Sequence, residues 1–379
     1  MILSHIARPL VSLVTLSSLL VLASCSSTSE ATRKTAAEKA LPSSSQTGSA
    51  PSTSVTPVQG DEFAQFAQWR EVDIFIDEMV KKHGFDRKAL QATLNKTHYV
   101  DRAIQLMKPA PPGKPKNWVA YRARFVEPVR IKAGVAFWNK YAGALQRAEK
   151  QYGVPAEIIV AIIGVETVYG RNTGNFRVMD AITTLAFSYP DTPNRVARMA
   201  YFRGELENTL LFARDEKIDP FSLLGSYAGA IGWPQFMPGS IRNYAVDFDG
   251  DGHIDLRNSP VDAIGSVAHF LIEHGWKPGE PIVFPAKVDS RNQEWQRFIN
   301  QPLEAKFSQQ ELRSAGVTPT QPLPTGMPFG LVDLQNGEAP TEYWLGAANF
   351  FAITQYNRSF FYAMSVNDLS KALRAARNP

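Results

Sequence analysis

The stretch from Val154 to Gly170 restricts the fold of this 379-residue chain more than any other segment. Pro155 suits the first turn of a helix, and Gly170 suits the residue that ends one. Between them the sequence is apolar on nearly every side, through Ile158, Ile159, Ile162, Ile163 and Val165. A helix that is apolar all round must be buried, so we expect the rest of the chain to pack around this one.

Glu166 lies near the C-terminal end of this predicted helix. A carboxylate there must be stabilised by water, by a partner or by a proton, because its desolvation is costly. Burial raises the pKa of a carboxyl group, which is what a general acid working near neutral pH requires. Periodicity alone favours a simpler interpretation, a helix end that emerges into solvent, so other features must decide.

Helical periodicity extends over most of the remaining sequence, with Asp86 placed as the N-cap of a short helix. The predicted helical segments are residues 63–85, 86–94, 127–152, 180–186, 195–213, 261–274 and about 343–377. The segment 281–288 is instead typical of a strand, and proline and glycine recur up to about residue 325. We therefore predict a mainly α fold, of the α+β class, with a small β-containing insert at about 281–325.

The first 24 residues are typical of a secretory signal, because Arg8 precedes a short apolar stretch from Leu10 to Leu22. Leu22-Ala23-Ser24-Cys25 resembles a bacterial lipobox, in which the cysteine is acylated; an ordinary signal with a chance cysteine is the alternative. Cys25 is the only cysteine of the chain, which excludes a disulfide or a cysteine-based zinc or catalytic site in the mature domain. Ser26 is typical of lipoproteins sent to the outer membrane. We expect a lipid-anchored protein that faces the periplasm.

Residues 25–60 carry the lipid-anchor cysteine and then a linker rich in Ser, Thr, Ala and Pro, without an aromatic residue. Such a segment cannot bury enough apolar surface to fold, so we expect a flexible tether. Residues 61–379 remain for the folded region. The net charge is only +4 and no Lys/Arg block stands out, which argues against nucleic acid as a partner.

A glycine-rich segment at 225–238 is the second candidate functional feature. Glycines let the backbone approach a ligand closely, and Gln235 offers both a donor and an acceptor to a sugar. Taken alone, the segment is equally a glycine-rich turn packed by aromatic side chains.

Together these two segments resemble the lytic murein transglycosylase B family, in its membrane-bound, outer-membrane lipoprotein form. The match is carried by Ile163-Gly164-Val165-Glu166-Thr167-Val168-Tyr169-Gly170 and by Gly229-Ala230-Ile231-Gly232-Trp233-Pro234-Gln235-Phe236-Met237-Pro238. Further matching motifs stand in the same order at residues 121–125, 137–139, 246–254, 262–267, 356–359 and 362–364. The resemblance covers roughly residues 61–379, and the number of separate motifs makes it specific.

The resemblance implies a lysozyme-like catalytic core with an additional helical region, and Glu166 as the single catalytic acid/base. The enzyme would cleave the MurNAc–GlcNAc β-1,4 bond of peptidoglycan without water and leave 1,6-anhydro-MurNAc ends. Ser226 would hold the N-acetyl group of the substrate. The other implied substrate-binding residues are Tyr121, Gln235, Tyr356, Asn357 and Tyr362. No second carboxylate is evident, although ordinary retaining and inverting glycosidases need two.

Two alternatives remain open at this stage. One is a muramidase that uses water, and the other is a non-catalytic lipoprotein that binds peptidoglycan.

The sequence also departs from the family pattern at residues 190–194, which leaves the roles of Arg195 and Arg198 undecided. Besides glycan strands, cell-wall synthesis or hydrolysis enzymes are candidate partners, and we expect a monomer.

The segment 247–262 resembles the start of an EF-hand calcium loop. Asp247, Asp249 and Asp251 stand at its first, third and fifth positions, Gly252 permits the turn, and His253 contributes a backbone carbonyl. The twelfth position is Asn258 instead of Glu, so we expect Asp262 to close the shell. The prediction is a structural Ca²⁺ ion and no organic cofactor; an Asx-rich turn without metal is the alternative.

Overall fold

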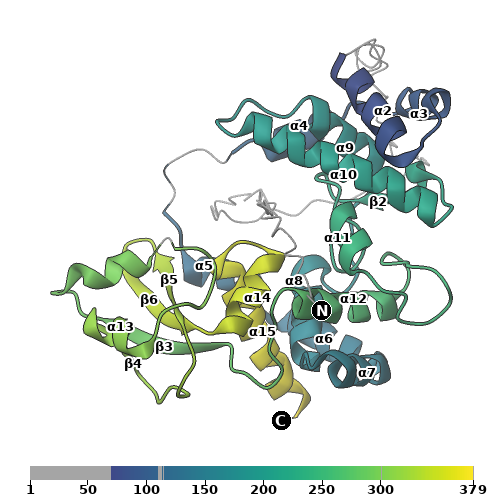
Figure 1. The fold of residues 1–379 in the computed structure, drawn as a ribbon. Helices are drawn as coiled ribbons and strands as arrows, with labels where there is room; N and C mark the ends of the chain where they lie inside the picture. Colours follow the sequence, from purple (N-terminus) through teal and green to yellow (C-terminus); the bar gives the residue numbers. More distant parts are fainter. Residues whose placement is uncertain (1–69, 110–112, 114, 300, 379) are drawn as a thin grey trace, which may run out of the picture.

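The computed structural model describes residues 70–109, 113, 115–299 and 301–378 (Figure 1). The predicted signal (1–24), the anchor Cys25 with its linker (25–60) and the first residues of the folded region lie outside the described residues. In the part of the chain that is described, no helix is both long and apolar enough to cross a membrane.

Helix α8 (Ala156–Thr167) forms the centre of the fold, as its composition predicts, and all of its residues except Glu166 are buried. It packs against α6 (Pro128–Lys140), α7 (Ala142–Tyr152), α12 (Pro260–Glu273) and α15 (Phe360–Arg377) (Figure 1). The single helix predicted over 127–152 is wrong in one respect. Tyr141 leaves the helical region at φ −111°, ψ 25°, and so divides this segment into α6 and α7.

A second group of helices, α2 (Arg70–His83), α3 (Arg87–Leu94), α4 (Asp101–Met107), α9 (Val178–Phe187) and α10 (Arg195–Asp215), forms the upper part of Figure 1. The predicted cap of α3 is confirmed, because the Asp86 carboxylate accepts the Ala89 N–H at 2.8 Å. Asp180 of α9 accepts the His98 N–H at 2.8 Å, which fixes the approach to α4. Helix α11 (Pro238–Tyr244) connects this group to the central helices (Figure 1).

Four antiparallel strands form the small sheet, in the order β4 (Val317–Pro319), β3 (Val283–Val288), β6 (Ala339–Gly346), β5 (Gly330–Asn336). The predicted insert is therefore real, but its end near residue 325 is wrong, because the sheet continues to Gly346. The helical region expected from about Tyr343 is wrong over its first residues for the same reason. Tyr343 and Trp344 pair with β3, and this pairing with residues distant in sequence decides their conformation.

The ladder between β3 and β6 is short. It joins Val283–Ala286 to Tyr343–Gly346, and beyond Ala286 strand β3 is paired with β4 alone. The sheet therefore splits at one end between its two central strands.

Smaller elements bring the connecting segments to the core. A two-stranded sheet joins β1 (Phe176–Arg177) to β2 (Leu224–Gly225), which places the glycine-rich segment beside the chain that follows α8. Helix α5 (Trp118–Arg122) packs against β5 and α15, and α14 (Ala348–Tyr356) follows directly from β6. The mainly α fold with a small sheet, expected from the sequence, is confirmed.

Candidate active site

Glu166 stands in the last turn of α8, and the chain leaves that helix abruptly. Val168, Tyr169 and Gly170 all have left-handed backbone conformations, with φ of 51°, 57° and 80°. Such a φ is an outlier for a β-branched residue like Val168 and marks local strain, which clusters at functional sites. The Tyr169 ring is held at 5.4 Å from that of Phe137, centroid to centroid. This abrupt end leaves the Glu166 side chain half-buried at the edge of the core.

The surroundings of Glu166 favour its protonated form. Desolvation raises its pKa from 4.5 to about 7, and the hydrogen bond from Tyr362 lowers the pKa only in part. The Tyr362 hydroxyl donates to Glu166 Oε1 at 2.6 Å. No second carboxylate in the described part of the chain contributes to this pKa shift. A carboxyl group with a pKa near 7 is suited to donate and accept protons at neutral pH.

Two tyrosines from the C-terminal helices stand at this carboxyl group. Tyr362 belongs to α15 and Tyr356 to α14, and their rings are stacked with centroids 6.2 Å apart at 13°. Burial raises the pKa of both hydroxyls well above the usual value, so both remain proton donors. Tyr356 donates its hydrogen to the Pro234 carbonyl at 2.6 Å. This bond ties the glycine-rich segment to the helix that precedes Tyr362.

Tyr121 approaches the same carboxyl group from α5. Burial raises the pKa of Tyr121 to about 12, with a further contribution from the charge of Glu166. Its ring packs against those of Phe125 at 5.1 Å and Phe361 at 5.4 Å, centroid to centroid. The Arg124 guanidinium lies 4.9 Å from the centre of the Tyr121 ring.

The glycine-rich segment folds into a compact turn that contains Ser226 and Gln235. Isolated bridges join Gly225 to Ile231 and Ile231 to Phe236, which brings the two ends of the turn together. Gln235 has a left-handed conformation, φ 51°, and its amide nitrogen donates to the carbonyls of Gly232 at 2.9 Å and Thr173 at 3.2 Å. Ser226 Oγ accepts the Ala230 N–H at 3.0 Å, which leaves its own hydrogen available to a ligand.

Thr167 was not singled out in the sequence, yet it joins the two motifs. Its buried hydroxyl donates to the Trp233 carbonyl at 3.0 Å and accepts the Gly170 N–H at 3.0 Å. Thr167 thereby fixes both the abrupt end of α8 and the position of the glycine-rich turn. The only sequence feature that could have indicated Thr167 was its position directly after Glu166. Its role depends on a partner 66 residues away, which the sequence does not reveal.

The remaining predicted residues lie as follows. Asn357 follows α14, half-buried and next to Tyr356. Arg198, only 6% exposed, donates to the Tyr189 hydroxyl at 3.1 Å. Arg195 donates to the Tyr189 carbonyl at 2.9 Å. Both arginines thus hold Tyr189, the residue directly before the segment 190–194.

The acidic loop brings three carboxylates together. Oxygen atoms of Asp247, Asp249 and Asp251 all lie within 4.8 Å of one another. Gly250 and Gly252 have φ of 83° and 93°, which allow the tight turn that a calcium loop requires.

His253 and Asp262 lie outside this group of carboxylates. The His253 ring stands 3.5 Å from a Glu216 oxygen, and its backbone carbonyl stays a predicted metal ligand. Both oxygens of the buried Asp262 carboxylate accept backbone N–H groups, from Phe248 at 2.8 Å, Asp249 at 3.1 Å and Asp255 at 2.9 Å. Because Asp262 is buried and lies outside the group of converging carboxylates, it is not placed to close the shell; it braces the loop instead.

Comparison with known proteins identifies the family. The family described as Transglycosylase SLT domain matches residues 65–371. This chain belongs to that transglycosylase family. The resemblance seen in the sequence is thus confirmed.

Individual relatives agree with this assignment. Membrane-bound lytic murein transglycosylase B of Escherichia coli is 44% identical over 335 residues, covering 86% of this chain and 88% of the relative. The catenated lytic transglycosylase SltB1 of Pseudomonas aeruginosa has a similar structure, with a TM-score of 0.75 and 43% identity over 82% of this chain and 99% of the other. The Escherichia coli lytic transglycosylase Slt35, solved in complex with calcium, gives a TM-score of 0.70 and 45% identity over 83% of this chain and 94% of the other.

Proposed function

We propose that this chain is a lytic transglycosylase of peptidoglycan in which Glu166 is the only acid/base. The observation that supports this most directly is the hydrogen bond of 2.6 Å that the Tyr362 hydroxyl donates to Glu166, a carboxyl group whose pKa desolvation raises to about 7. A glycosidase that hydrolyses through two carboxylates would need the second within about 5–9.5 Å of the first. A reaction within the substrate itself needs only one.

In the proposed reaction, protonated Glu166 donates its hydrogen to the oxygen that links MurNAc to GlcNAc. The bond from C1 of MurNAc to that oxygen breaks, and GlcNAc leaves with a free hydroxyl. The C6 hydroxyl of the same MurNAc then attacks C1, and the Glu166 carboxylate takes the hydrogen that this hydroxyl loses. A 1,6-anhydro ring forms, the enzyme regains its proton, and no water is consumed. The family relative SltB3 of Pseudomonas aeruginosa, 27% identical, has been solved with NAG-anhNAM-pentapeptide, which contains such an anhydro sugar.

The neighbouring side chains support this chemistry. The free hydrogen of Ser226 Oγ would be donated to the N-acetyl carbonyl oxygen of MurNAc. This hydrogen bond would hold the N-acetyl group in place. Gln235 presents its amide oxygen to sugar hydroxyls, since its nitrogen is already bonded to two backbone carbonyls. Tyr121, Tyr356, Asn357 and Tyr362 complete the wall around Glu166.

Mass spectrometry of the products tests the proposal. Peptidoglycan digested by purified residues 26–379 should yield fragments that end in 1,6-anhydro-MurNAc, lighter by one water than hydrolysed ends. Reducing MurNAc ends would replace the intramolecular attack with water and make the protein a muramidase. Binding to sacculi without any release would make it a non-catalytic peptidoglycan-binding lipoprotein.

The variant Glu166→Gln should fold normally and lose at least about 100-fold in turnover, because a neutral amide can neither donate nor accept the required proton. The rate of anhydro-muropeptide release measures this. The matched control Glu149→Gln changes an exposed glutamate on α7 and should keep wild-type turnover. Residual activity of Glu166→Gln above a tenth of wild type would assign the acid/base work to another residue.

For the acidic loop we propose a structural Ca²⁺ held by the carboxylates of Asp247, Asp249 and Asp251 and by the backbone carbonyl of His253. The donor set fits, because Ca²⁺ prefers oxygen ligands and the three carboxylates already converge. The complex of Slt35 with calcium adds support from a relative. The ion would stiffen the loop and takes no part in the chemistry at Glu166.

We also propose that Cys25 carries the lipid that anchors the protein to the outer membrane, facing the periplasm. A relative of 44% identity is named as membrane-bound, and Cys25 stands within the lipobox-like segment. Replacement of Cys25 by Ala should release the protein into the soluble periplasmic fraction, as fractionation and immunoblotting would show.

A further inference from the structure

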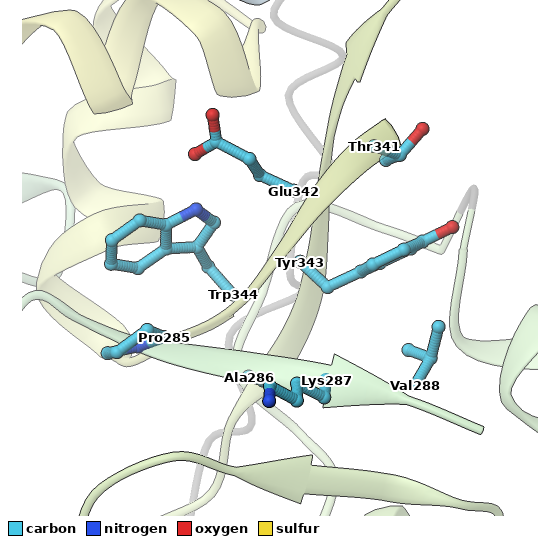
Figure 2. A pocket seen from close by; sticks show the side chains of 8 residues that line it. All are labelled: Pro285, Ala286, Lys287, Val288, Thr341, Glu342, Tyr343 and Trp344. Carbon is cyan, nitrogen blue, oxygen red and sulfur yellow. The ribbon is translucent and has the colours of Figure 1, made fainter. Parts of the chain in front are cut away.

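The split between β3 and β6 contains a cavity of about 470 Å³ away from Glu166. The cavity is lined by Pro285, Ala286, Lys287, Val288, Thr341, Glu342, Tyr343 and Trp344 (Figure 2). The paired part of the ladder ends at Ala286 and Tyr343. If the register continued, Lys287 would face Glu342 and Val288 would face Thr341. The two strands separate instead, and each leaves two residues of backbone without a partner across the split.

The side chains around the cavity offer a specific set of interactions. Side chains alternate along a strand, and Figure 2 shows Glu342 and Trp344 on one side of β6 and Thr341 and Tyr343 on the other. Neither Lys287 nor Glu342 forms an ion pair with any other described residue. The Trp344 indole N–H is buried and has no acceptor, which is costly in a folded protein. The split therefore presents one cation, one anion, one unused donor and two aromatic rings.

We propose that this cavity binds the stem peptide of the peptidoglycan substrate. An extended peptide can pair with the free backbone of either strand, as in the addition of a strand to a sheet edge. A stem peptide carries free carboxylates for Lys287 and, in its diamino acid, an ammonium group for Glu342. A volume of about 470 Å³ lies in the range of small-ligand sites and accommodates only a few residues. The proposal rests on the proposed function, since that function supplies a substrate with peptides.

The position of the sheet connects such a peptide to the catalytic residues. Strand β6 leads directly into α14, which ends at Tyr356, and β5 contacts α5, which carries Tyr121. A stem peptide held in the split would keep its glycan strand beside these helices. The consequence is selection of glycan strands that still carry peptides.

A photo-crosslinking experiment locates the peptide. The free stem tetrapeptide without sugar, carrying a diazirine, would be irradiated with the folded chain and the adducts mapped by mass spectrometry. We expect adducts at residues 285–288 or 341–344. Adducts confined to the surroundings of Glu166, or none at all, would overturn the proposal.

Calorimetric titration with the same peptide, unlabelled, tests the charges. Lys287→Glu and Glu342→Lys should each weaken binding at least about tenfold, which corresponds to about 1.4 kcal/mol. The control variants Lys150→Glu and Glu149→Lys reverse exposed charges on α7, away from the sheet, and should bind as the wild type does. Affinities of the Lys287 and Glu342 variants within twofold of the wild type would contradict the assignment.

Two further measurements distinguish a stem-peptide site from other peptide sites and from a failure of the proposed function. An all-L peptide with the same charges should bind at least about tenfold more weakly than the stem peptide; equal affinity would make the split a site for protein segments and overturn the stem assignment. Cleavage of peptide-free glycan strands by the wild-type enzyme tests the proposed function independently. If the strands are cleaved but the peptide fails to bind, only the present inference fails.

Discussion

The carboxyl group of Glu166 is subject to two opposing influences on its pKa. Burial at the end of α8 raises the pKa to about 7, and the hydroxyl of Tyr362 lowers it by donating to Oε1. The balance keeps both protonation states accessible at neutral pH, which a single acid/base needs because it must first donate and then accept. Tyr362 is therefore expected to set the working pH of the enzyme.

The variant Tyr362→Phe removes the hydrogen bond that lowers the pKa of Glu166, so this pKa should rise further. A hydrogen bond to a charged group contributes about 1.5–3 kcal/mol, which corresponds to about one to two pKa units. The alkaline limb of the profile of kcat/KM against pH, where protonated Glu166 is lost, should move to higher pH by that amount. The control Tyr152→Phe on α7 should leave the limb in place. An unchanged or acid-shifted limb in Tyr362→Phe would show that Tyr362 does not govern Glu166.

The raised pKa of Glu166 also makes stability depend on pH. Because the folded-state pKa of about 7 exceeds the ordinary 4.5, the folded protein binds this proton more tightly than the unfolded chain does. The stabilising contribution is complete below pH 4.5 and is lost as the pH rises through about 7. Glu166→Gln avoids this loss. Its melting temperature relative to the wild type should therefore increase between pH 4.5 and pH 8, as calorimetry at both values would show; a constant difference would contradict the raised pKa.

At the scale of elements, α5 illustrates how the sheet supports the site. This helix has only 5 residues, too few to be stable alone. Asn117 caps its start, and Asn336 at the end of β5 accepts the Val119 N–H at 3.0 Å. The hairpin between β5 and β6 thus fixes the helix that carries Tyr121.

Replacement of Asn336 by Ala removes the acceptor of the Val119 N–H, a part-buried hydrogen bond. The free energy of unfolding should fall by about 0.5–1.5 kcal/mol, and turnover should fall between about 10- and 100-fold as Tyr121 loses its position. Asn336→Asp retains an acceptor oxygen and should recover most of both losses. Denaturation and muropeptide release measure the two effects. If turnover is unchanged in Asn336→Ala, the sheet does not position Tyr121.

The helices and strand β3 could largely be predicted from the sequence, and the other strands could not. A helix is recognised from contacts three and four residues apart, which is why the segments now seen as α8, α10 and α12 were found close to their true bounds. Strand β6 depends on its pairing with β3 and β5. Since β3 lies far away in the sequence, the local pattern around β6 does not reveal this pairing. At the division of α6 from α7 the sequence has only Gly143, which lies inside α7, so the helix end at Tyr141 could not be predicted from the local pattern.

At the scale of the whole molecule, the acidic loop is joined to the glycine-rich turn. The Trp233 N–H donates to the Leu256 carbonyl at 2.8 Å, and the Trp233 indole donates to the Arg257 carbonyl at 2.9 Å. Gly232 permits this approach, since a Cβ there would lie 2.1 Å from the Leu256 carbonyl oxygen. A change in the conformation of the loop should therefore also change the conformation of the turn that holds Gln235.

Calcium at 10 mM should raise the melting temperature of the wild type and shift the signal of a fluorine label on the Trp233 indole. With a dissociation constant of about 10⁻⁴ M, this concentration stabilises the folded state by about 2.7 kcal/mol. Asp247→Asn combined with Asp251→Asn should abolish both responses, whereas Asp289→Asn in a separate loop should preserve them. A wild type that shows no rise in melting temperature would exclude the calcium site.

Individual site residues could be proposed from the sequence, but not their connections. The resemblance indicated Glu166, Gln235 and Tyr362, whereas the bond from Thr167 to Trp233 and the stacking of Tyr356 on Tyr362 required the folded chain. These contacts join segments far apart in sequence, which no spacing rule describes. The closure expected from Asp262 is not supported for a related reason: the fold buries this carboxylate outside the group of three that converge, and spacing along the chain does not show this.

The bond between Tyr362 and Glu166 spans 196 residues and joins α8 to α15. The ribosome therefore makes the two partners at different times. A fragment that stops before α15 contains Glu166 without the hydroxyl that stabilises its charged form. We expect such a fragment to leave the cell wall intact, so that activity appears only once α15 has been made and has folded against α8.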